Sequence, residues 1–109
     1  MGASNAVAIV GLRFNVNHGE IAGLEARRDP RQVAARKAGL TAYWGREPAL
    51  DDHVLLVGLL VANLGMENSA HAAVDAASMW GFIENATEKL QAAQLVGEVR
   101  LHLQFFEDA

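Results

Sequence analysis

An arginine and a histidine lie two residues apart near the end of the chain. On a β-strand, Arg100 and His102 would emerge on the same face. Histidine can act as a general acid or base near neutral pH, whereas arginine holds carboxylates and phosphates. We therefore take His102 as the candidate catalytic residue, and Arg13, Arg100 and Tyr43 as candidate binding residues for a small anionic or polar molecule. The alternative is that they are ordinary polar positions on half-buried strands.

Several other chemistries are excluded or unsupported. The 109 residues include no cysteine, which rules out disulfides, thiolate metal sites and a cysteine nucleophile. The four histidines, at positions 18, 53, 71 and 102, form no His-x-His or His-x3-His pair. His71 and Asp75 would offer two metal ligands on one helix, but a site needs at least three. The Walker, dinucleotide and Gly-x-Ser-x-Gly patterns do not occur. We therefore predict no metal and no cofactor.

Charge and composition limit the classes of partner. The chain carries a formal charge of −4, and 51% of its residues are hydrophobic. This balance is typical of a globular protein and argues against a nucleic-acid partner. The longest nearly pure apolar run, 54–62, is far shorter than the roughly 20 residues needed to cross a bilayer. The N-terminus does not resemble a signal peptide. We therefore expect a cytoplasmic protein with one α+β domain, residues 1–109, and no membrane partner.

Four segments read as strands. Apolar and polar residues alternate in 6–16 and in 97–106, which is the pattern of a strand with one buried face. Segment 53–64 is apolar at nearly every position, so we expect a central strand that is buried on both faces. Segment 40–44 is expected to be a short strand, with a helical continuation as the alternative.

The intervening segments read as helices. Asn17 is expected to cap a first helix, and Asp29 a second that begins at Pro30 and ends before Gly39. The apolar spacing in 70–91 predicts the longest helix, capped by Asn68 or Ser69.

The order strand, helix, strand, strand, helix, strand predicts an α+β fold. We expect a two-layer sandwich of the ferredoxin-like split βαβ type (βαββαβ), with a mostly antiparallel sheet and the helices on one face. If 40–44 were helical, three strands and two right-handed crossovers would remain.

This layout leaves one sheet face without helices. Val7, Ile9 and Phe106 would form an apolar patch there, and a second copy of the chain is its simplest cover. The first functional hypothesis is therefore a homo-oligomeric binding or assembly module that uses the open sheet face. The alternative is a small dimeric barrel-type enzyme or ligand-binding protein, with His102 as its acid or base. A closed pocket containing His102 and an arginine would favour the alternative, whereas a dry contact filled by the apolar patch would favour the module.

Overall fold

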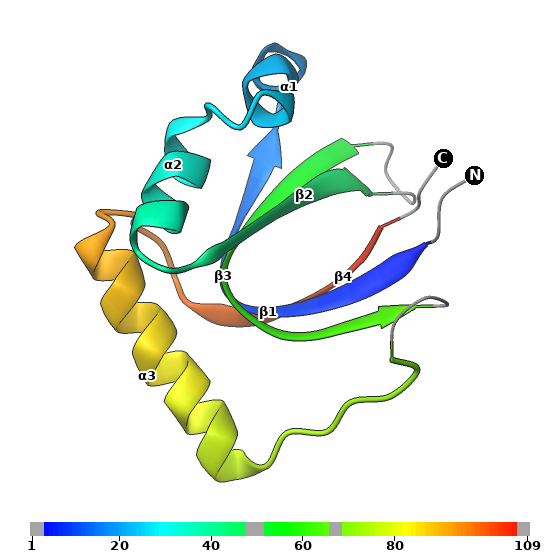
Figure 1. The fold of residues 1–109 in the computed structure, drawn as a ribbon, viewed down its shortest axis with the longest axis vertical. Coiled ribbons are helices and arrows are strands. Elements are labelled where there is room, and N and C mark those ends of the chain that lie inside the picture. The colour runs from blue at the N-terminus through cyan, green and yellow to red at the C-terminus, as the bar shows by residue number, and fades with distance from the viewer. Residues whose placement is uncertain (1–3, 48–51, 66–68, 107–109) are drawn as a thin grey trace.

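The computed structural model describes residues 4–47, 52–65 and 69–106. These residues form an α+β fold, with an open four-stranded antiparallel sheet and three helices (Figure 1). Neighbouring strands follow the order β2-β3-β1-β4, and each adjacent pair is antiparallel. The elements, in chain order, are β1 (Asn5–Val16), α1 (His18–Glu25), α2 (Pro30–Lys37), β2 (Thr41–Glu47), β3 (Asp52–Gly65), α3 (Ala76–Ala92) and β4 (Arg100–Phe106).

All four predicted strands are present. Residues 41–44 lie in strand β2 (Thr41–Glu47) rather than in a helix, so the predicted strand is present and begins one residue later. Segment 53–64 lies in β3, which pairs with β2 on one side and β1 on the other, so the prediction of a central strand is confirmed. Strand β4 begins at Arg100, three residues later than predicted, and it stands at one edge of the sheet.

The predicted caps of the first two helices are also present. The backbone N–H of Asn17 donates to the Glu20 carboxylate at 3.1 Å. The carboxylate of Asp29 accepts the backbone N–H of Arg31 at 2.9 Å, in the first turn of α2. Gly39 follows α2 with a φ of +76°, the left-handed conformation that glycine adopts at low cost.

The prediction for the third helix was wrong at its start. Helix α3 begins at Ala76 rather than at residue 70, and Asp75 caps it by accepting the backbone N–H of Ser78 at 2.7 Å. Ser69 does not cap the helix, and Asn68 lies outside the described residues. Residues 70–73 are exposed. The Asp75 side chain, rather than Ser69, therefore caps the helix and sets its start at Ala76.

Strands β1 and β3 curve strongly along their length (Figure 1). Gly11 and Gly58 face each other near the middle of this pair. A Cβ atom added to Gly58 would lie 2.8 Å from the Cα of Gly11, which real Cβ atoms essentially never do. The close approach of the strands therefore requires glycine. The curvature brings β2 towards β4, although the two do not pair: the Tyr43 and Phe106 rings are 5.0 Å apart.

The curved sheet has a core on each face. The larger core lies between the helices and the convex face, and it includes Leu24, Leu55 and Leu90. The smaller core lies on the concave face. It connects the two edge strands, because Tyr43 of β2 packs against Phe106 of β4. Its buried members are Val7, Ile9, Val54, Leu56 and Phe106.

The smaller core corrects the prediction of an exposed apolar patch. Val7, Ile9 and Phe106 are only 1%, 0% and 5% exposed within a single chain. The prediction assumed that the sheet face without helices is exposed, whereas the curvature packs these side chains of the concave face against one another. None of the described helices is long and apolar enough to span a membrane.

Candidate functional site

An open depression of about 210 Å³ lies where β4 separates from β1. The β1–β4 pairing ends at Gly11 and Arg100, so residues 12–16 of β1 pair with β3 on one side and have no strand partner on the other among the described residues. The depression follows this free edge of β1. It is lined by Leu12, Arg13, Phe14, Val96, Gly97, Glu98, Arg100 and His102.

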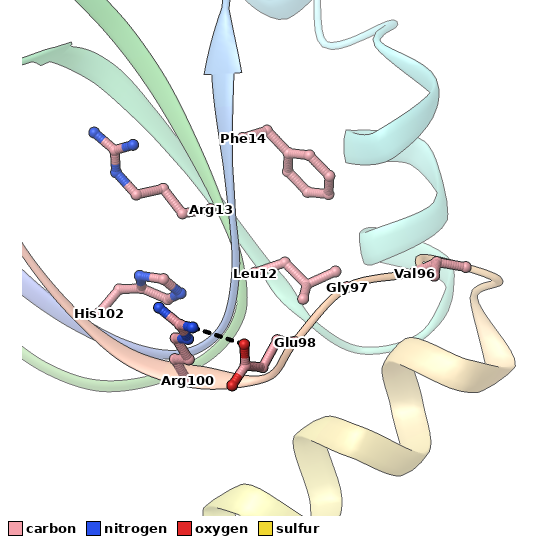
Figure 2. Close-up of a pocket in the computed structure, with 8 residues that line it drawn as sticks. All are labelled: Leu12, Arg13, Phe14, Val96, Gly97, Glu98, Arg100 and His102. Carbon is pink, nitrogen blue, oxygen red and sulfur yellow. Dashed lines mark hydrogen bonds and ion pairs between the residues drawn. The ribbon is translucent and has the colours of Figure 1, made fainter.

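The depression has a polar side and an apolar side. Figure 2 shows Arg13, Arg100 and His102 on one side of the β1 ribbon, and Leu12 and Phe14 on the other. This division follows from the alternation of side chains along a strand. The predicted site residues Arg13, Arg100 and His102 therefore do lie around one depression.

Arg13 is held in place by three side chains. Its Nη2 donates to the Glu47 carboxylate at 2.8 Å, its Nη1 to Asn15 at 3.2 Å, and its Nε to Gln104 at 3.4 Å. Glu47 comes from β2 and Gln104 from β4. Arg13 therefore ties the two edge strands together across the concave face, and much of its hydrogen-bonding capacity is already used.

Arg100 is held much more loosely. It donates to the Glu98 carboxylate at 2.7 Å, and the two side chains are 65% and 72% exposed. The hydrogen bond and the positive charge of Arg100 lower the pKa of Glu98. Solvent screens such a surface pair, and it contributes little to stability. The Arg100 guanidinium is therefore available to exchange Glu98 for another anion.

His102 is neutral at neutral pH. Burial lowers the pKa of its imidazole below the usual value of 6.5, and the positive charges of Arg13 and Arg100 lower it further. A backbone hydrogen bond with Gly11 partly opposes these effects. The Nε2 atom is buried and has no hydrogen-bond partner among the described residues. Proton exchange with a substrate through Nε2 would therefore require the surroundings of this atom to move.

Tyr43 does not lie at the depression. Its ring packs on Phe106 in the smaller core, and its hydroxyl accepts a hydrogen bond from the Asn5 side chain at 2.7 Å. Asn5 also donates to Asn63 at 2.9 Å. The structure therefore separates Tyr43 from the other three predicted site residues.

Sequence reasoning missed the partners of both arginines. Glu98 lies two residues before Arg100, and this spacing is a signal that could have suggested their pairing. Glu47 carried no such signal, because it meets Arg13 only through the curvature of the sheet.

A second surface lies on the outer side of β4. Leu101, Leu103 and Phe105 are 47%, 77% and 51% exposed. They pair with Val10, Ala8 and Ala6 of β1 and therefore share its convex, helix-bearing face. No described helix covers them. We call these three residues the β4 strip.

The described residues contain no group of three or more histidine, aspartate or glutamate side chains arranged to hold a metal ion. The ionisable groups that line the depression are the guanidinium groups of Arg13 and Arg100, the carboxylate of Glu98 and the imidazole of His102. Comparison of the chain with protein-family models, curated proteins and solved structures gives no significant match.

Proposed function

We propose that this chain is a homo-oligomeric assembly module that pairs with a second copy of itself through β4. The observation that carries the proposal is the β4 strip, a row of exposed apolar side chains on a strand at the edge of the sheet. Such an edge has backbone groups free to pair with another strand. Proteins usually protect an exposed edge with lysine or proline, and the sequence of β4, RLHLQFF, contains neither.

The sequence of β4 is compatible with two-fold antiparallel pairing. Centred on Leu103, such pairing places Leu103 opposite its own copy and Leu101 opposite Phe105 of the other copy. All three members of the strip then meet apolar partners. On the other face, His102 would lie opposite Gln104, so no like charges oppose each other there. Shifting the centre to His102 would instead place the two histidines opposite each other.

The exposed area indicates a reversible dimer. The exposed fractions of the strip amount to about one and three-quarter apolar side chains per copy, and burying them in both copies would contribute about 5–10 kcal/mol. Association costs about 4–15 kcal/mol, and new backbone hydrogen bonds add a modest gain. These terms are similar in size, so we expect a dissociation constant in the micromolar range, which the concentrations of the test below span.

The oligomeric state tests the proposal. Light scattering and sedimentation equilibrium from low micromolar to several hundred micromolar protein should show a concentration-dependent dimer. Leu103→Lys should be monomeric and folded, because this side chain is 77% exposed in the single chain. Val96→Lys is a matched control, because Val96 is 90% exposed but lies outside β4, and it should still dimerise. A wild-type chain that stays monomeric throughout would refute the proposal.

Disulfide formation tests the register. The chain has no cysteine, so Leu103→Cys would introduce a single thiol. In the centred register the two copies of residue 103 have Cα atoms about 4.5–5.5 Å apart, within the range of roughly 4.4–6.8 Å found in disulfides. Leu103→Cys should therefore form covalent dimers much faster than Val96→Cys. Equal rates would contradict this register.

We also infer that the fold is the ferredoxin-like split βαβ sandwich. Two observations support this assignment. The helical connections join β1 to β2 and β3 to β4, and the strands of each pair are parallel to each other, with one strand of the other pair between them. Helices α2 and α3 also pack against the same face of the sheet. This arrangement interleaves two βαβ units, which is the meaning of split.

A further inference from the structure

The depression at the free edge of β1 is large enough for a small organic molecule. Its volume of about 210 Å³ equals that of about seven waters in the liquid, which corresponds to a ligand of about seven to ten non-hydrogen atoms. This is below the roughly 300–1,000 Å³ of pockets that hold drug-sized molecules. The size therefore favours a ligand no larger than a single amino acid or a small aromatic acid.

The charges of the depression favour a carboxylate. Arg13 already pairs with Glu47, and it is held further by Asn15 and Gln104. Arg100 has one carboxylate partner among the described residues, the exposed Glu98. A guanidinium presents paired donors that match a carboxylate, so a ligand carboxylate could replace Glu98. An exposed ion pair typically shifts an equilibrium by about fivefold at most, so the exchange would cost little.

The opposite side of the depression favours an apolar body. Leu12, Phe14 and Val96 line it (Figure 2), and Val96 is 90% exposed. Gly97 passes so close to Leu12 that a Cβ at position 97 would lie 2.8 Å from a methyl group of Leu12. The segment before β4 thus forms the wall of the depression next to Leu12.

We propose that this depression binds small monocarboxylates with an apolar or aromatic body. Arg100 takes the carboxylate in place of Glu98, and the body lies against Val96 and Leu12. This site differs from the β4 strip, so it does not depend on the proposed assembly.

Benzoate is a suitable probe, because it combines a carboxylate with a compact ring. Titration into 15N-labelled protein should give saturable chemical-shift changes centred on Gly97, Arg100 and His102, with a dissociation constant in the millimolar range expected for a ligand of this size. The uncharged analogue benzamide should give no saturable response. Repeating the titration with Leu103→Lys separates ligand binding from assembly, because this variant should bind benzoate as a monomer.

Two substitutions with opposite effects test the role of Arg100. Arg100→Gln should abolish the saturable response. Glu98→Gln removes the competing carboxylate and should tighten benzoate binding by about 1.5- to fivefold. Glu84→Gln changes the net charge equally at an exposed position on α3 and should leave the affinity unchanged. The proposal would be overturned if the chemical-shift changes rose linearly with benzoate concentration without saturating, or if benzoate and benzamide gave equal changes. An unchanged affinity of Glu98→Gln for benzoate would also overturn it.

Discussion

Gly58→Ala should destabilise the protein severely, because it blocks the curvature of the sheet. The new Cβ would lie 2.8 Å from the Cα of Gly11 and closer still to the carbonyl oxygen of Val10. Both obstacles are backbone atoms of a paired central strand, so no side-chain rotation can relieve the clash. Strand β1 or β3 would have to move, and the smaller core depends on their present path.

The expected magnitude follows from this geometry. Overpacking a core with flexible side chains typically costs about 1–3 kcal/mol. Here the backbone of two central strands must shift as well, so we expect a loss of at least about 3 kcal/mol in the free energy of unfolding. That is a large part of the roughly 5–15 kcal/mol by which a native protein is typically stable.

Gly81→Ala is the matched control, because a Cβ at that position in helix α3 would meet nothing within 4 Å. It should stabilise the protein by about 0.5–1 kcal/mol, since alanine is the better helix former. Urea denaturation followed by circular dichroism would measure both changes. A loss below about 1 kcal/mol in Gly58→Ala would refute the claim that glycine is required at the bend.

Two further predictions concern pH and the cap of α2. Because burial lowers the pKa of His102, the neutral imidazole stabilises the folded state above pH 6.5, and this contribution should be lost as the pH falls below 6.5 towards the folded pKa. Each unit by which the pKa of His102 is lowered corresponds to about 1.4 kcal/mol in the free energy of unfolding. Urea denaturation should therefore show that the free energy of unfolding falls between neutral pH and about pH 5, and that this fall is smaller in His102→Gln. Asp29→Asn should lower the free energy of unfolding by about 1–3 kcal/mol at neutral pH, because it removes the buried carboxylate that pairs with Arg31. Arg31 lowers the pKa of Asp29, so the difference from wild type should shrink only as the pH falls below 3.8 and through the folded pKa, and a difference that vanishes by pH 6 would contradict this account.

The strands could be predicted from the sequence because their signals are local. Alternation at period two identified β1 and β4, and the unbroken apolar run identified β3 as central. The short strand β2 could be predicted from the sequence because Gly39 ends the preceding helix. The start of α3 was mispredicted because the apolar spacing continues towards residue 70, whereas the helix begins at Ala76, where the Asp75 side chain caps it.

The curvature of the sheet could not be predicted in the same way. Gly11 and Gly58 are ordinary glycines in the sequence, and their importance arises from pairing across 47 residues. Two errors followed from the assumption that the sheet face without helices is exposed. Val7, Ile9 and Phe106 were expected to face outward, and Tyr43 was expected to join the arginines rather than pack on Phe106.

The candidate site was predictable only in part. The spacing of Arg100 and His102 predicted that both side chains emerge on one face of a strand, and both line the depression. Arg13 also reaches it, because β1 pairs with β4 up to Gly11. The sequence could not show that Arg13 is held by several partners whereas Arg100 is held loosely, since Glu47, the carboxylate partner of Arg13, comes from β2 and reaches it only through the curvature. That difference makes Arg100, rather than Arg13, the proposed anchor for a ligand.

The curvature also explains why the exposed apolar surface lies on the outside of the sheet. On the concave face, Val7, Ile9 and Phe106 pack within the single chain and therefore need no second chain to cover them. The buried residues of α3, Ala86 and Leu90, lie in its C-terminal half, whereas Trp80 near its start is 64% exposed. Helix α3 thus covers β1 and β3 with one half and leaves the β4 strip uncovered. The sequence predicted an exposed apolar surface on the concave face, whereas the structure has the β4 strip on the convex face. There, a second copy could extend the sheet without opening either core.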